Sequence, residues 1–188
     1  DANFIRTLTK QAEAIPLHEA VPVALDWVNG RRTPDANQEL KAAMTGLSLG
    51  TKAPHIFKAL VNAICFGSKM IVDRFESEGV KITSVIGIGG VARKSPFIMQ
   101  TLANVLNMPI KVAESDQAPA LGAAIYAAVA GGVYGDVIEA SKKMGSDFEA
   151  EYFPQTDQVE KYELFMQQYA ELGNFVENVI KKKEHVHI

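Results

Sequence analysis

Residues 83–104 read TSVIGIGGVARKSPFIMQTLAN, and this stretch decides the fold. Residues 82–88 are short, apolar and β-branched, which predicts a buried parallel strand. The strand runs into Gly87, Gly89 and Gly90. Glycine at these positions permits positive φ angles and lets a ligand approach the backbone without meeting a Cβ atom. The stretch therefore predicts a tight turn whose backbone a ligand can approach closely.

A helix is expected directly after the glycine turn. Ser95 is a suitable N-cap and Pro96 suits the first helical position. Free N–H groups at a helix start attract anions and ligand oxygens. Strand, glycine turn and helix together predict a nucleotide-type site. The alternative is a tight turn that binds nothing.

The rest of the chain alternates helical and extended patterns, which predicts an α/β domain. The longest internal helix is expected at 54–78, and its apolar stripe, which includes Ile56, Leu60 and Ile64, is expected to face the core. A second short strand is expected at 109–113. Further helices are predicted at 3–15, 96–106, 119–129, 136–144 and 159–182.

Composition indicates an ordinary globular chain of 188 residues with 47% hydrophobic and 22% charged residues. The net charge of −3 gives no global attraction to nucleic acid or to an anionic membrane, and we expect neither as a partner. No apolar run looks long enough to span a bilayer. The single cysteine, Cys65, lies in an apolar helical pattern, so we expect an inert core thiol in a reducing, cytoplasmic compartment.

The loop 26–34, DWVNGRRTP, combines turn signals with polar side chains. Asp26, Trp27 and Asn29 make it a candidate ligand-binding loop. The alternative is a surface turn that Trp27 anchors in the core. His185 and His187 have no carboxylate or cysteine framework around them, so no metal site is expected there.

A dinucleotide-binding fold is one interpretation of the glycine turn. Residues 87–92 fit G-x-G-x-x-A, and Glu114 follows the next strand, where a ribose-binding acid would lie. Two features count against it: Ser95 and Pro96 place the helix start after the motif, and only one βαβ unit is evident. The pattern G-x-x-x-x-G-K-[ST] is absent, which excludes a P-loop within this sequence.

The other interpretation comes from a resemblance. Residues 88–96, Met99-Gln100 and 115–124 together resemble the C-terminal domain of the FGGY carbohydrate kinases. The second signature of that family is also similar to part of this chain, although Leu60 and Asn62 depart from it. The positions that fit are Ala42, Met44, Gly46, Leu47, His55, Ile56 and Ala59.

The resemblance implies an actin-like ATPase (ribonuclease H-like) α/β fold, with a mixed sheet flanked by helices. It implies phosphoryl transfer from ATP, with Mg²⁺, to a sugar hydroxyl. Residues 1–188 would be the second, adenosine-binding domain of a two-domain kinase, and the sugar-binding first domain would lie outside this chain. By motif position the nucleotide-binding residues would be Gly46, Gly89, Gly90, Ala92, Lys94 and Ser95.

Within the family, residues 25–34 and 107–117 resemble the members that phosphorylate the ketopentose L-ribulose to L-ribulose 5-phosphate in L-arabinose catabolism. Another sugar, such as xylulose, is the alternative substrate. Asp26, Trp27 and Asn29 would then lie at the substrate cleft. The resemblance leaves a homodimer open.

The catalytic aspartate and the glycine-threonine phosphate turn of the family precede the matching region, and neither is found in this sequence. No catalytic residue is therefore assigned in this chain, and we expect it to be inactive alone. The competing class is a binding module without catalysis.

Overall fold

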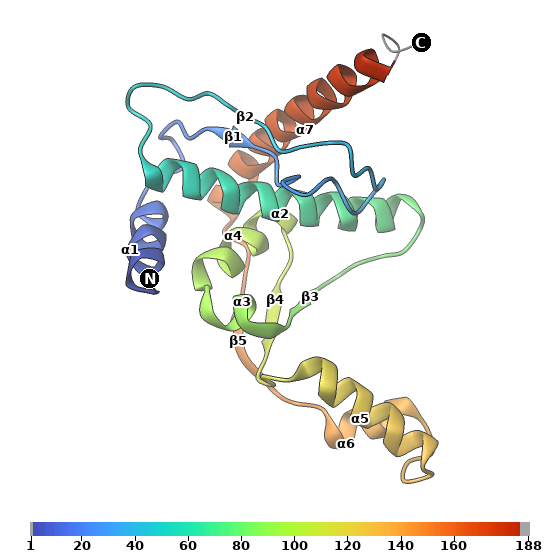
Figure 1. Ribbon diagram of the computed structural model, residues 1–188. Helices are drawn as coiled ribbons and strands as arrows, with labels where there is room; N and C mark the ends of the chain where they lie inside the picture. Colours follow the sequence, from blue (N-terminus) through green and yellow to red (C-terminus); the bar gives the residue numbers. More distant parts are fainter. Residues whose placement is uncertain (1, 185–188) are drawn as a thin grey trace.

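The computed structural model describes residues 2–184 of the chain, and it is an α/β structure (Figure 1). The helices are α1 (Ala2–Glu13), α2 (Ala53–Ser77), α3 (Gly89–Lys94), α4 (Pro96–Leu106), α5 (Ala118–Ala130), α6 (Val137–Met144) and α7 (Thr156–Glu184). The strands are β1 (Val23–Ala24), β2 (Met44–Thr45), β3 (Val85–Gly87), β4 (Ile110–Ala113) and β5 (Phe148–Tyr152). His185 and His187 lie outside the described residues.

The main sheet is mixed, with β4 in the centre. β3 pairs with β4 in parallel, and β5 pairs with β4 in the antiparallel direction. Ile110 and Val112 lie on one face of β4 and are buried, while Lys111 on the other face is only partly buried. The predicted parallel pairing of β3 and the strand at 109–113 are confirmed. β3 is not buried as predicted, since Ile86 is 56% exposed. β3 is also shorter than 82–88, because its ladder with β4 holds three residue pairs.

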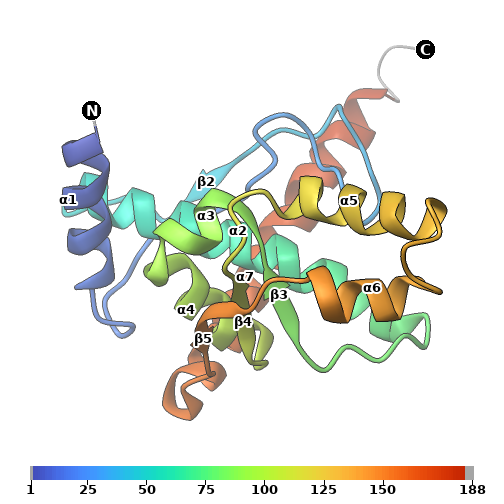
Figure 2. The same ribbon diagram turned by 90° about the horizontal axis from the view of Figure 1, so that it is seen from below.

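Helix α2 runs through the middle of the molecule, between β1 on one side and α4 on the other (Figures 1 and 2). α1 and α7 also contact it. Phe66 of α2 packs on Tyr162 and Tyr169 of α7, with ring centroids 6.5 and 5.6 Å apart. Cys65 beside it is buried, and burial raises the pKa of its thiol, so the predicted inert core thiol is confirmed.

The predicted core stripe of α2 is partly wrong. Ala59 and Ala63 are buried, but Ile56 and Leu60 are partly exposed and Ile64 is 51% exposed. The buried face of α2 is instead formed by a neighbouring row of its own side chains. This row contains Lys58, Val61, Asn62, Cys65 and Phe66. The amide oxygen of Asn62, one of the two departures from the family signature, is buried without a hydrogen-bond partner among the described residues.

The expectation that no apolar run could span a bilayer also needs correction. Over residues 2–184, α2 is long and apolar enough to do so by length and composition alone. A core helix passes the same test, and α2 packs against α1, α4 and β1 with Lys58 and Asn62 on its buried face. Its packing accounts for the buried apolar residues of α2, whereas Ile56, Leu60 and Ile64 remain exposed.

A helix starts inside the glycine motif, which the sequence analysis did not predict. α3 begins at Gly89, because Gly89 adopts φ +80° and lets the extended Ile88 serve as its N-cap. Ser95 ends α3 and is also the N-cap of α4, but its side chain makes no capping hydrogen bond. Pro96 occupies the start of α4, as predicted.

Helices α5 and α6 pack side by side and project from the sheet (Figures 1 and 2). α5 is rich in small residues, and Ile125 is the buried residue on it. Its N-cap is Gln117, whose backbone N–H donates to Ser115 Oγ. Neither Ser115 nor Asp116 is therefore the N-cap of α5.

The central strand should carry far more stability than its neighbour. Ile110 of β4 is fully buried, whereas Ile86 of β3 is 56% exposed. Ile110→Ala should lower the free energy of unfolding by about 2–5 kcal/mol through lost burial and a residual cavity. The matched control Ile86→Ala should cost within about 0.5 kcal/mol. Urea denaturation of both variants measures this, and equal losses would contradict the sheet described here.

Candidate nucleotide-binding site

The three glycines after β3 are needed for different reasons. A Cβ atom on Gly87 would lie 3.0 Å from Ala92 Cβ and 3.4 Å from Met99 Sδ. Gly89 needs its positive φ of 80°. Gly90 has no positive φ, and a Cβ atom there would meet nothing within 4 Å. The fold therefore requires glycine at the first two positions and leaves open space at the third.

That open space belongs to a cleft of about 580 Å³ beside the glycine turn. Gly90, Arg93 and Lys94 line it from α3. Asp116 and Gln117 line it from the segment between β4 and α5, and Glu149 lines it from β5.

Arg93 connects the segments that line the cleft. Its Nε and Nη2 donate to the two carboxylate oxygens of Glu149 at 2.6 and 2.9 Å, and its Nη1 pairs with Asp116. The hydrogen bonds from Arg93 hold the pKa of the Glu149 carboxyl below its ordinary value, against a smaller opposing effect of burial. One side chain thus joins three segments that are distant in sequence, and the sequence analysis did not single it out.

The predicted nucleotide-binding residues do not all meet at this cleft. Gly90 and Lys94 line it, while Gly89 and Ser95 neighbour them in the chain without being lining residues. Ala92 is buried, packs in the core under the sheet and does not line the cleft. Gly46 lies just after β2, with φ +80°, and does not line the cleft.

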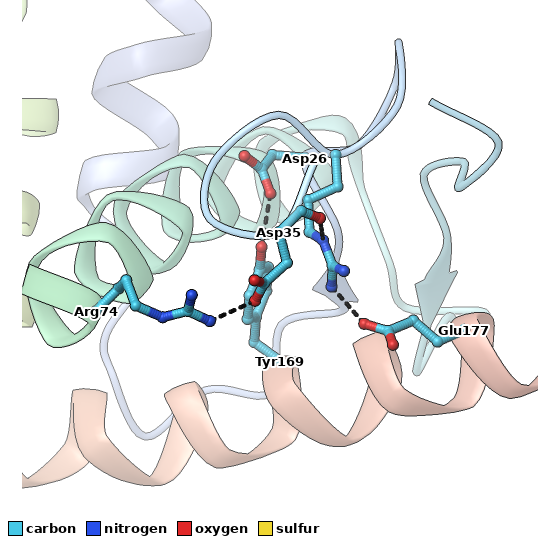
Figure 3. Close-up of polar contacts among 6 residues, drawn as sticks. Asp26, Asp35, Arg74, Tyr169 and Glu177 are labelled. Carbon is cyan, nitrogen blue, oxygen red and sulfur yellow. Dashed lines mark hydrogen bonds and ion pairs between the residues drawn. The ribbon is translucent and has the colours of Figure 1, made fainter. Parts of the chain in front are cut away.

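A second cleft, of about 500 Å³, contains the other predicted site residues. Asp26, Trp27 and Asn29 all line it, together with Tyr169 of α7. Tyr169 Oη donates to Asp26 Oδ1 at 2.7 Å (Figure 3). Burial raises the pKa of the Tyr169 phenol well above its ordinary value, and the Asp26 carboxylate raises it further. The two clefts have no lining residue in common.

The structure confirms that Trp27 anchors the loop 26–34 in the core, while ligand binding by this loop stays a prediction. Trp27 is 4% exposed and anchors the loop in the core, edge-on to Tyr169. The guanidinium of Arg31 lies 5.1 Å from the Trp27 ring centroid and pairs with Glu177 of α7 (Figure 3). Asp26 and Asn29 remain at the cleft, so Trp27 forms a wall and the polar side chains form the lining.

Gly67 of α2 is a residue that the sequence analysis treated only as part of the helical stripe. A Cβ atom there would lie 2.8 Å from Asp26 Oδ2. Glycine in the middle of a helix costs stability, so its presence signals a close approach. Among residues 2–184, no group of three His, Cys, Asp or Glu side chains is arranged to hold a metal ion.

The profile of the C-terminal domain of the FGGY family of carbohydrate kinases matches residues 5–131. The chain belongs to this family. Similar proteins include a ribulokinase of Vibrio parahaemolyticus, 46% identical over 95% of this chain and 31% of that protein. A ribulokinase of Bacillus licheniformis is 37% identical over 93% of this chain and 33% of its own length. This FGGY domain thus spans about a third of the length of the curated relatives it matches.

Solved structures agree on the fold. Xylulose kinase from Lactobacillus acidophilus matches with a TM-score of 0.81 at 23% identity, over 91% of this chain and 34% of that one. Plasmodium falciparum glycerol kinase with ADP matches with a TM-score of 0.70 at 20% identity, over 88% and 33%. The predicted actin-like ATPase fold of the FGGY kinases is confirmed.

Family membership also decides against a dinucleotide-binding module. One argument against that module was wrong, since α3 does begin within the glycine motif. The other argument holds for the described residues, because β3 and β4 form a single parallel pair and β5 is antiparallel.

Two glycine-to-alanine changes on helices test how Asp26 is held. A Cβ atom added to Gly122 of α5 would meet no atom within 4 Å. Gly122→Ala should therefore raise the free energy of unfolding by about 0.5–1 kcal/mol, because alanine has the higher helix propensity. Gly67→Ala should instead lower the free energy of unfolding by about 1 kcal/mol, because the added Cβ atom would displace Asp26 and disturb its hydrogen bond with Tyr169. Thermal unfolding compares them, and a gain in Gly67→Ala would contradict the contact.

Proposed function

We propose that this FGGY domain is the adenosine-binding part of a two-domain kinase that transfers a phosphoryl group from ATP to a ketopentose, with L-ribulose as the substrate. The named relatives at 46% and 37% identity support the choice of sugar. The observation that carries the nucleotide site is Gly90, where the fold itself does not require glycine and the space beside it is open. A ligand lying against the backbone explains why no side chain is present.

The cleft beside Gly90 suits a nucleoside better than a triphosphate. Arg93 and Lys94 are balanced by Asp116 and Glu149, so the lining offers no excess of positive charge. Arg93 is already bonded to both carboxylates, which leaves Lys94 and Gln117 as the polar side chains to meet the ligand. Gly89 and Ser95 would border the adenosine, while Ala92 supports the turn from below.

The family resemblance implies Mg²⁺ together with ATP, and the first domain of the kinase would hold it. In the complete kinase it neutralises charge on the phosphates of ATP. This chain positions the nucleoside. Its place is fixed by the glycine turn, the Arg93 contacts and the backbone of α3.

The first domain would supply the catalytic base and the phosphate cradle, and the chain alone would have no kinase activity. Turnover of L-ribulose and ATP by the isolated chain would contradict this. Asp26 and Asn29, at the second cleft, are the side chains proposed to meet the sugar. A cytoplasmic location remains a prediction from the single reduced cysteine.

Nucleotide titration tests the site. ATP or ADP should bind the chain, and Gly90→Val should abolish binding while leaving the fold intact, because no atom lies within 4 Å of the added Cβ. Lys94→Ala should weaken binding by about 1 kcal/mol, the scale of one exposed polar contact. Calorimetry measures both.

The matched control is Gly122→Val, another glycine with open space around it that does not line the cleft. It should bind nucleotide like the parent chain. Tight binding of NAD without any response to ATP would end the kinase proposal.

A further inference from the structure

A third cavity, of about 310 Å³, lies where the end of α1, α2, α4 and the start of α7 meet. It has no lining residue in common with the nucleotide cleft or with the Asp26 cleft. Its size is that of a site for a small metabolite. Its walls combine apolar side chains such as Ile15 and Phe97 with an unusual number of amide, hydroxyl and charged groups.

The buried charged group in this cavity is Lys58 of α2, which is only 4% exposed. Its Nζ donates to the backbone oxygen of Ile15. An ammonium group has three N–H donors, so two remain for another acceptor. No carboxylate among the described residues forms an ion pair with it, and burial lowers the pKa of Lys58, with Glu13 and Glu19 opposing at longer range.

The amide groups around the cavity are oriented by Asn104, which is also buried. Its Oδ1 accepts from the backbone N–H of Gln155 at 2.8 Å, and a backbone N–H can only donate. Its Nδ2 must therefore face the Gln155 and Gln158 side chains, and it donates to the Oε1 atom of each at 3.2 Å. Each glutamine Oε1 atom thereby accepts one hydrogen bond from Asn104.

The Nε2 groups of Gln155 and Gln158 are left as donors, and neither bonds to another side chain or backbone group in the described part of the chain. Two lysine N–H groups and the amide groups of Gln155 and Gln158 thus belong to residues that border one cavity, which Gln100 and Glu13 also line. The start of α7 adds its partial positive charge at the same place. The set is rich in donors, which suits oxygen atoms carrying negative charge.

We propose that this cavity binds the oxyanion group of a small metabolite, a phosphate or a carboxylate, through Lys58, Gln155 and Gln158. The apolar walls formed by Ile15 and Phe97 would contact its carbon skeleton. Glu13 at the exposed rim disfavours a second anionic group at the outer end of the ligand. A ligand bound here would join the end of α1 to α4 and to the start of α7.

Nitrogen-15 NMR of the chain tests the proposal, with inorganic phosphate and acetate as the two probes. The side-chain amide signals of Gln155 and Gln158 should shift and saturate with at least one of them, and the stronger probe tells phosphate from carboxylate. Lys58→Met, of similar length and without charge, should weaken binding at least tenfold. The control Lys69→Met, on the same helix but paired with Asp73 at the surface, should leave it unchanged.

A second variant keeps the test decisive if Lys58→Met does not fold. Gln158→Met removes one donor and should weaken binding about fivefold. Saturating ATP and the Gly90→Val change should both leave the signals unaffected. The proposal is overturned if neither anion gives a saturable shift, if neutral glycerol shifts the signals equally, or if ATP displaces the anion.

Discussion

The packing of α2 against α7 through Phe66, Tyr162 and Tyr169 is the contact on which the rest of the structure depends. These rings fix the long central helix against the last helix, and Trp27 joins them edge-on from the loop 26–34. Tyr169 then uses its hydroxyl to hold Asp26 at the mouth of a cleft. One aromatic cluster therefore sets both the core and the position of a polar loop.

The elements that carry the glycine turn pack on these two helices in succession. α4 packs on both α2 and α7, and the sheet that carries the glycine turn packs on α3 and α4. The nucleotide cleft lies at the outer side of that sheet, closed by Arg93 between Asp116 and Glu149. Its polar lining depends on exposed ion pairs between three segments, so the cleft is less firmly constrained than the aromatic core.

The sequence predicted local features well, because periodicity, caps and turn residues act over a few positions. The helices α2, α4 and α7, the strand β4 and the buried Cys65 follow from such patterns. The exposed face of α2 was mistaken for core because a stripe with helical spacing does not say which neighbour covers it. Ile64 shows this most clearly. α3 was missed because its start rests on the φ of Gly89 and not on a capping side chain.

The site was predictable only where it depends on the chain near the glycine turn. Gly90 and Lys94 were found because they lie in one motif, and Asp26 and Asn29 because they lie in one loop. Glu149 and Tyr169 were not predicted as site residues. Glu149 contacts Arg93, which is 56 positions away in the sequence, and Tyr169 contacts Asp26, which is 143 positions away. Separations of that size leave no local pattern, and only the folded chain reveals them.

The most direct test of the central claim is a crystal structure of this FGGY domain with ADP. The account predicts adenosine in the cleft beside α3, against the backbone of Gly90 and within reach of Lys94, with Arg93 still bonded to Glu149. Density for ADP in the Asp26 cleft, or at any place where Gly90→Val would not exclude it, would contradict the account.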